Sequence, residues 1–343
     1  MRKLCLGDGA LVAVVLAAGS VFAQPNAPVQ TFPLRDTAGL IAVNVKTEAV
    51  RYLGRDAVRI TVVGEDGGGL ALLPGTDFQD GVIEADIALK ATTPPGVPYP
   101  GFVGIAFRAR PDASRYELLY LRPGNADSPD QAKRNHSVQY VSEPGFGWYR
   151  LRREWPSVYE SHAELAFETW TSVRIEVAGR TARLFVNGQT RPSLVVDGLK
   201  GEDLHGAVGL WGYTNQESYF SNLRITPAAP EKVTNGSEVA GAWDLTYAGD
   251  AGRFPASVEL HRDGDKVTGT WSSPLGQGRP VTGTWRAGYV ELAIPVEWPK
   301  DAGQGAPGPV TAYLAGWIDG DSGRGRMRVE GRSDGIWTAK RKN

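Results

Sequence analysis

Apolar and polar residues alternate along much of this 343-residue chain, and no long stretch has the spacing of an amphipathic helix. Every second side chain is apolar in residues 82–89, and the same alternation is present in residues 102–110 and 173–177. Successive side chains of a β-strand point to opposite faces, so this pattern predicts strands with one buried face. The chain is therefore expected to be all-β.

The turn signals favour antiparallel pairing of these strands. The chain has 43 Gly and ten Trp, a composition typical of short strands joined by tight turns. The strand-like run Arg183–Val186 leads into Asn187-Gly188, a pair that tolerates the positive φ angles of a hairpin turn. The larger, N-terminal part is predicted to be an antiparallel jelly-roll sandwich.

A short internal repeat marks the C-terminal part of the chain. Val-Thr-Gly-Thr-Trp occurs at 267–271 and again at 281–285. The motifs Asp263-Gly264-Asp265 and Asp319-Gly320-Asp321 have the composition of tight turns. The first could belong to a calcium loop, but it lacks the further carboxylates that such a loop needs. Residues 238–343 are predicted to form a small lipocalin-like up-and-down β-barrel or meander.

The remaining boundaries follow from composition. Residues 228–237 are predicted to be a linker, since Pro227-Ala228-Ala229-Pro230 precedes a short polar stretch. This leaves residues 24–227 for the jelly roll.

The N-terminus has the layout of a secretory signal peptide at 1–23. A basic start precedes the apolar residues 10–18, and small residues end at Ala23. The apolar run is shorter than the roughly 20 residues that a membrane-spanning helix needs. The protein is therefore expected to be periplasmic or secreted, without membrane insertion after cleavage.

The charge and cysteine content exclude several functions. Lys plus Arg number 37 against 38 for Asp plus Glu, so no bulk charge favours nucleic acid or an anionic membrane. Cys5, the single cysteine, falls in the expected signal peptide, which excludes disulfides and thiolate chemistry in the mature chain. The sequence also lacks a G-x-S-x-G motif, a phosphate-binding glycine loop and a dinucleotide fingerprint.

Four segments in succession resemble a known family. They are residues 170–177, 182–188, 206–211 and 218–225. In this order they are similar to the last strands of concanavalin A-like lectin/glucanase jelly rolls of the laminin-G type, and most of all to the 3-keto-disaccharide hydrolase family (formerly DUF1080). The resemblance implies a jelly roll that handles glycans, although the fold also hosts lectins, lyases and adhesion modules.

The resemblance does not extend to a glucanase active site. Laminarinase-type relatives carry two glutamates flanking an aspartate on one strand, which gives a retaining pair of carboxylates. Here Glu84 and Asp86 occur without a second glutamate. They are interpreted as residues of the polar face of a strand.

Residues 115–160 combine aromatic and hydrogen-bonding side chains and are interpreted as one long insertion over the sandwich. Aromatic rings stack on sugar faces, while arginine and amide groups bind hydroxyls. The alternative is a structural lid with its arginines in solvent. The candidate saccharide-binding residues are Tyr116, Tyr120, Arg122, Asn125, Arg134, Asn135, Gln139, Tyr140, Trp148 and Arg150.

His136 is the candidate catalytic residue in this segment, paired with Glu117 or Glu160. A neutral imidazole next to a carboxylate is suited to general acid–base chemistry. The other histidines show no metal-ligand spacing, so neither a metal site nor a cofactor is predicted. A structural calcium ion stays open, because such sites leave little trace in sequence.

Three functions remain open from the sequence. The first is an exported carbohydrate-active protein that binds a glycoside in a jelly-roll cleft, with hydrolysis of that glycoside left open. The second is a non-catalytic module that binds a glycan or a surface. In the third, the barrel holds a small apolar ligand, unless Trp243, Trp271, Trp285 and Trp317 fill its interior.

Overall fold

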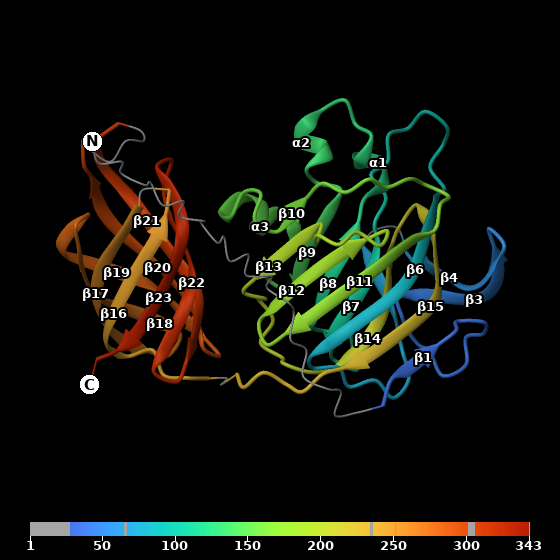
Figure 1. Ribbon diagram of the computed structural model, residues 1–343, viewed down its shortest axis with the longest axis horizontal. Coiled ribbons are helices and arrows are strands. Elements are labelled where there is room, and N and C mark those ends of the chain that lie inside the picture. The colour runs from blue at the N-terminus through green and yellow to red at the C-terminus, as the bar shows by residue number, and fades with distance from the viewer. Residues whose placement is uncertain (1–27, 65–66, 234–235, 251, 301–305, 343) are drawn as a thin grey trace, which may run out of the picture.

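The computed structural model describes residues 28–64, 67–233, 236–250, 252–300 and 306–342. The expected signal peptide at 1–23 lies outside these residues, as does part of the expected linker. Two β-domains stand side by side, a sandwich and a barrel (Figure 1). The sandwich strands run from Gln30 to Pro227, and the barrel strands run from Gly241 to Arg341. The prediction of an all-β protein is confirmed.

The first sheet of the sandwich has eight strands. Seven of them follow the order β13-β12-β11-β6-β15-β4-β3, and β1 pairs with β15. Every pairing is antiparallel, as expected. The strands are β1 (Gln30–Phe32), β3 (Val45–Tyr52), β4 (Arg55–Val62), β6 (Gly81–Ala91), β11 (Thr171–Ala178), β12 (Thr181–Val186), β13 (Leu194–Asp197) and β15 (Gln216–Pro227).

The second sheet has seven strands in the order β10-β9-β8-β7-β14-β5-β2. Its pairings are antiparallel too. The strands are β2 (Ile41–Val43), β5 (Gly68–Leu72), β7 (Val103–Ala109), β8 (Tyr116–Leu121), β9 (Val138–Glu143), β10 (Glu160–Ser161) and β14 (Ala207–Tyr213). The apolar inner faces of the two sheets pack together to form the core.

One expectation about this domain needs correction. Asn187 and Gly188 both have positive φ, but β12 pairs with β13 through Leu184↔Leu194, so the connection is longer than a two-residue hairpin. The tight turn lies one connection earlier, at Gly179-Arg180, where Ala178 pairs with Thr181. Glu84 and Asp86 lie on β6, where they pair with arginines (Glu84 with Arg224), as expected of a polar strand face.

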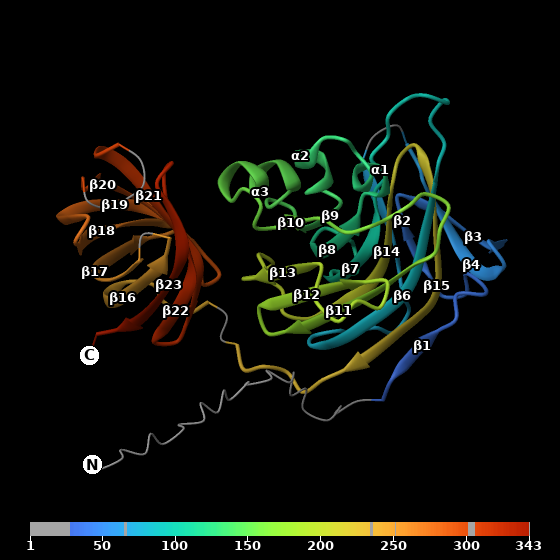
Figure 2. The same ribbon diagram turned by 45° about the horizontal axis from the view of Figure 1, so that its top comes forward.

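The segment 115–160 is not a single long insertion, as the sequence suggested. It contributes β8, β9 and β10 to the sheet, because its apolar residues alternate and complete the core. Three short helices lie between these strands. They are α1 (Pro123–Ala126), α2 (Gln131–Arg134) and α3 (Trp148–Glu154), and they gather over one end of the sandwich (Figure 2).

The C-terminal domain is a closed barrel in which each strand pairs with the next and β23 pairs back with β16. Two-residue turns follow Asp263 and Asp319, as predicted. The repeated Val-Thr-Gly-Thr-Trp motifs lie on the neighbouring strands β18 and β19. The strands are β16 (Gly241–Gly249), β17 (Gly252–Asp263), β18 (Lys266–Ser273), β19 (Gly276–Arg286), β20 (Tyr289–Trp298), β21 (Gly308–Asp319), β22 (Ser322–Val329) and β23 (Ser333–Arg341).

Tryptophans fill the barrel, but they are not quite the predicted ones. The fully buried rings belong to Trp243, Trp271, Trp298 and Trp337. Trp285 is only partly buried at the margin of this core. Trp317 is buried outside the barrel, against the sandwich. A core packed with four indole rings favours a structural barrel over an apolar-ligand carrier.

The two domains meet in a compact set of contacts. The indole nitrogen of Trp317 donates to the carbonyl of Leu199 at 2.7 Å. The guanidinium of Arg180 lies 3.1 Å above the same ring, and Lys200 contacts the phenol of Tyr289. Because these residues are buried, the contacts hold the barrel against the sandwich.

Candidate functional site

A cleft of about 1000 Å³ crosses the outer face of the seven-stranded sheet. Its floor and rims combine seven aromatic rings with charged and amide groups. The aromatic residues are Tyr99, Phe102, Tyr116, Tyr120, Trp148, Trp211 and Tyr213. The polar residues are Arg122, Asn125, Asp127, Ser128, Lys133, His136, Glu143 and Arg152.

Strand alternation determines which side chains face the cleft. In β8, Tyr116, Leu118 and Tyr120 line it, and the residues between them point into the sandwich. In β14, a Cβ added at Gly212 would meet Ile60 and Ser218 of the other sheet, so Gly212 faces inward. Its neighbours Trp211 and Tyr213 therefore face the cleft.

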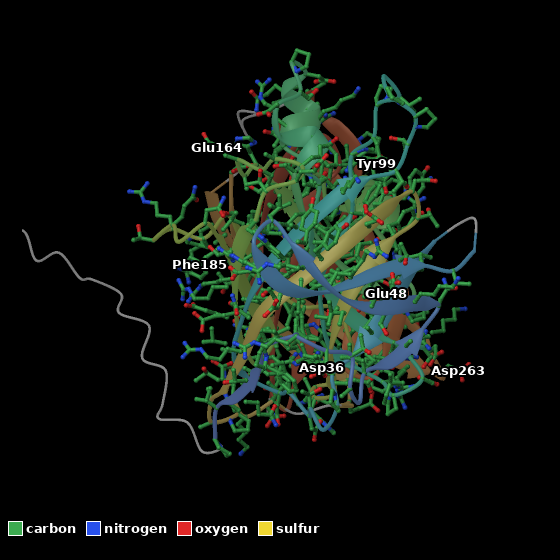
Figure 3. All side chains as sticks on the ribbon, turned by 90° about the vertical axis from the view of Figure 1, so that its right-hand side faces the viewer. Asp36, Glu48, Tyr99, Glu164, Phe185 and Asp263 are labelled. Carbon is green, nitrogen blue, oxygen red and sulfur yellow. The ribbon has the colours of Figure 1, made fainter. Side chains whose placement is uncertain are left out.

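Partly buried hydrogen bonds fix one rim of the cleft. The amide of Gln216 donates to the carbonyl of Phe102 at 2.7 Å and accepts from its N–H at 2.8 Å. The phenol of Tyr99 donates to the carbonyl of Thr214 at 2.5 Å. Tyr99 lies on the loop between β6 and β7, which stands at the edge of the sandwich (Figure 3). This rim is preorganised, since its aromatic residues are held by the backbone of the sheet.

The opposite end of the cleft is polar. Arg152 of α3 donates to both carboxylate oxygens of Glu160, and its Nη2 lies 2.7 Å from Oε2. The Nδ1 atom of His136 lies 2.9 Å from the same oxygen. The Glu160 side chain is only 3% exposed, so it lies behind His136 rather than in the cleft. A buried carboxylate therefore lies against the Nδ1 edge of the His136 imidazole.

The protonation of two cleft residues is shifted from the usual values. Burial, and then the positive charges of Arg152 and Arg122, lower the pKa of His136, although Glu160 acts in the opposite direction. Burial raises the pKa of Glu143, which lines the cleft. The imidazole is thus favoured in its neutral form, and the carboxyl of Glu143 is easier to protonate than an exposed one.

Six of the predicted site residues line this cleft. They are Tyr116, Tyr120, Arg122, Asn125, His136 and Trp148. Glu160, a predicted partner of His136, contacts it as described above. Asn125 also supports the site, since its side-chain amide donates to the carbonyl of His136 at 3.3 Å.

Glu117 and Tyr140 lie on the inner face of the sheet, which corrects the predicted pairing of Glu117 with His136. The carboxylate of Glu117 accepts from the phenol of Tyr140 and from the N–H of Gly201. Because β8 alternates, Glu117 points away from Tyr116 and Tyr120. Burial raises its pKa. Neither residue can act together with His136.

Four other predicted binding residues lie outside the cleft lining. Gln139 is on the correct face, between Tyr120 and Glu160, but its side chain is fully buried. Arg134 donates to the carbonyls of Ser128 and Pro129 and so fixes the turn before α2. Asn135 accepts from Gln131. Arg150 pairs with Glu154 and with Glu291 of the barrel.

Sequence reasoning missed several cleft residues. They include Tyr99, Phe102, Lys133, Glu143, Arg152, Trp211 and Tyr213, which line the cleft. The Gly-Leu-Trp-Gly-Tyr run at 209–213 did contain a signal, because alternation places Trp211 and Tyr213 on one face. The others depend on how loops and helices fold back over the sheet.

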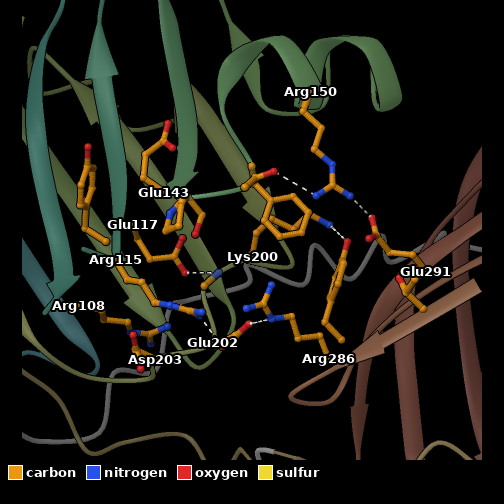
Figure 4. A pocket seen from close by; sticks show the side chains of 18 of the residues that line it. Arg108, Arg115, Glu117, Glu143, Arg150, Lys200, Glu202, Asp203, Arg286 and Glu291 are labelled. Atoms are coloured by element: carbon orange, nitrogen blue, oxygen red, sulfur yellow. Dashed lines mark hydrogen bonds and ion pairs between the residues drawn. The ribbon is translucent and has the colours of Figure 1, made fainter. Parts of the chain in front are cut away.

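A second, smaller pocket of about 290 Å³ lies where the domains meet (Figure 4). It is rich in charged side chains, many of which pair across it. Arg286 of the barrel lies 2.8 Å from Glu202 of the sandwich, and Arg150 lies 2.5 Å from Glu291. The paired charges indicate a contact between domains rather than a ligand site.

Two further findings concern the described residues. None of their His, Cys, Asp and Glu side chains form a group of three or more that could hold a metal ion. Within the same residues, no helix has the length and apolarity needed to cross a membrane.

No family model and no curated protein matches the sequence. Solved structures are similar at low identity. A Bacillus subtilis protein of unknown function with a galectin-like fold has 10% identity over 61% of this chain and 99% of its own, with a TM-score of 0.42. The carbohydrate-binding module CBM66 from Bacillus subtilis has 15% identity over 55% and 95%, with a TM-score of 0.38. The lectin UEA-II, in complex with galactose, has 9% identity over 59% and 99%, with a TM-score of 0.39.

Proposed function

We propose that this protein binds a saccharide in the cleft of its sandwich domain. The main support for this proposal is the composition of the cleft. Seven aromatic rings line it together with the polar residues Arg122, His136 and Arg152. Pyranose rings present apolar C–H faces and hydroxyl edges, and they bind where rings and hydrogen-bonding groups converge. The volume of about 1000 Å³ suits an oligosaccharide rather than a single sugar.

Binding is tested by titrating the purified protein with a panel of oligosaccharides while the tryptophan fluorescence is recorded. Trp148 and Trp211 line the cleft, so a bound sugar is expected to change the emission. Saturable binding that weakens in Trp211→Ala, and not in Tyr313→Ala on the barrel surface, supports the proposal. If no saccharide of the panel changes the emission or the melting temperature, the proposal fails.

A second candidate function is cleavage of the bound glycoside. It is supported by the contact between His136 and Glu160, because a neutral imidazole backed by a buried carboxylate can take up and return a proton. The sequence resemblance to 3-keto-disaccharide hydrolases suggests 3-keto glycosides as probes. Mass spectrometry of a glycoside panel, with His136→Ala and the barrel control His261→Ala, separates an enzyme from a binding module. If no product is detected, cleavage is contradicted and the binding function alone is retained.

We also propose that the protein is exported, on the basis of the signal peptide expected at 1–23. Sequencing the N-terminus of the protein recovered from the periplasm or medium tests this. A mature chain that begins at Gln24 is expected, whereas an intact Met1 would contradict export by cleavage.

A further inference from the structure

Arg122 has an unusual position in the cleft. The residue is 5% exposed, yet it lines the cleft at the polar end. One of its terminal nitrogens donates to the phenol of Tyr120 at 2.5 Å, and its Nε has no hydrogen-bond partner. No carboxylate of the described residues forms an ion pair with this guanidinium. Burial of an unpaired charge is costly, so such groups are normally paired.

Aromatic rings offset only part of this cost. The guanidinium carbon lies 5.1 Å from the ring centre of Tyr120, 5.4 Å from Phe102 and 5.8 Å from Trp148. Cation–π contacts stabilise the charge but offer no acceptor to the Nε–H group. An acceptor is therefore missing at a site where three rings already surround the cation.

The buried carboxylate at this end of the cleft, that of Glu160, is already occupied. Glu160 accepts from Arg152 and contacts His136, so its carboxylate is shared between two groups that do not include Arg122. With His136 neutral, this end of the cleft carries two arginines and one carboxylate. Asp127 and Glu143 also line the cleft, but neither pairs with Arg122, and burial raises the pKa of Glu143. One positive charge remains without a counterion.

We propose that the cleft selects acidic saccharides and that Arg122 binds their anionic group, a uronate carboxylate or a sulfate ester. This rests on the saccharide-binding function proposed above. A guanidinium matches either group with charge-assisted hydrogen bonds. The sugar ring lies against the exposed indole of Trp148, which is next to both Arg122 and Arg152.

The test uses matched oligosaccharides that differ only in charge. Uronate trisaccharides are compared with their carboxyl-reduced forms, and sulfated trisaccharides with their desulfated forms, by calorimetry. We expect one charged series to bind more than about tenfold tighter than its neutral counterpart, with an affinity that falls as salt is added. The series that does so identifies the anionic group.

The variants are Arg122→Met and Arg110→Met. Arg122→Met is expected to abolish the preference for the charged sugar while retaining weak binding of the neutral one. Arg110 pairs with Asp203 outside the cleft, so Arg110→Met should keep the preference. Should Arg122→Met not fold, Arg122→Gln replaces it, because glutamine retains a donor for Tyr120.

The outcomes separate the two proposals. If neutral and charged sugars bind equally, or if the preference persists without Arg122, the inference is overturned and saccharide binding stands. If no saccharide binds, both are overturned. A preference that depends on Arg122 supports both.

Discussion

The imidazole of His136 and the carboxylate of Glu160 are 2.9 Å apart at the polar end of the cleft, and the carboxylate is buried behind the imidazole. Arg152 contacts the same carboxylate from α3. The buried carboxylate of Glu160 on β10 thus contacts two other segments of the chain, α3 and the segment that carries His136. This arrangement ties α3 to the sheet, and the negative charge of Glu160 opposes the lowering of the His136 pKa that burial causes.

Glu160→Gln should destabilise the protein. The amide keeps the shape of the side chain but loses the charge that Arg152 and His136 contact, and a lost charged hydrogen bond costs about 2 kcal/mol. We expect a decrease of this size in the free energy of unfolding, measured by urea denaturation. Glu164→Gln is the control, since Glu164 is exposed and is expected to leave stability unchanged.

Acidification should reduce stability through His136. Its folded pKa lies below the unfolded value of 6.5, so the unfolded chain takes up a proton first as the pH falls through this region. The free energy of unfolding is therefore expected to fall toward acidic pH. In His136→Gln this part of the pH dependence should be absent, which melting temperatures between about pH 8 and about pH 5 can measure. An unchanged pH profile in the variant would contradict the burial of His136.

Trp148→Ala should weaken saccharide binding with little effect on folding. The residue is 45% exposed, so its truncation leaves no buried cavity. Loss of a stacking ring costs about 0.5–1.5 kcal/mol, which is up to about tenfold in affinity. Calorimetric titration gives the affinity, and a thermal melt gives the stability. A large loss of melting temperature would indicate that Trp148 is part of the core.

Trp317→Ala should uncouple the two domains. The indole is 4% exposed and carries both the hydrogen bond to Leu199 and the contact with Arg180. Truncation of a buried tryptophan costs about 3–5 kcal/mol. Calorimetry is expected to show two separate unfolding transitions in place of a coupled one. A single transition shifted as a whole would mean that other contacts are sufficient for coupling.

Lys200→Met should stabilise the protein at neutral and lower pH. Burial lowers the pKa of Lys200 to about 7, from 10.5 in an exposed lysine. Between these values the unfolded chain holds a proton that the folded protein lacks, so the free energy of unfolding rises with pH. Below about pH 7 both states are protonated and the cost of burial is at its maximum.

The advantage of Lys200→Met over the wild type is therefore expected to be largest below about pH 7 and to shrink toward about pH 10. Urea denaturation at several pH values measures it. Lys266→Met is the matched control, because Lys266 is exposed. The difference in free energy of unfolding between Lys266→Met and the wild type should not change with pH. A variant that is less stable than the wild type at low pH would show that the ammonium group is well compensated.

The local pattern of the sequence determined the strands and many of the turns. Alternation is a property of neighbouring residues, so it predicted β6, β7 and β11, and the composition of the Asp-Gly-Asp motifs predicted the tight turns after Asp263 and Asp319. The repeated Val-Thr-Gly-Thr-Trp motif is likewise a local pattern, and it marked β18 and β19, two adjacent strands of the barrel. These features need no knowledge of the rest of the chain.

Only the tertiary structure decided which face of each strand meets the cleft. Period-two alternation separates Glu117 from Tyr116 but does not say which of them points toward the other sheet. That choice depends on packing against distant strands, and it placed Glu117 inside and Glu160 beside His136. It likewise placed Trp317 against the sandwich instead of inside the barrel, because a strand in a closed barrel can bury both faces when a second domain covers the outer one.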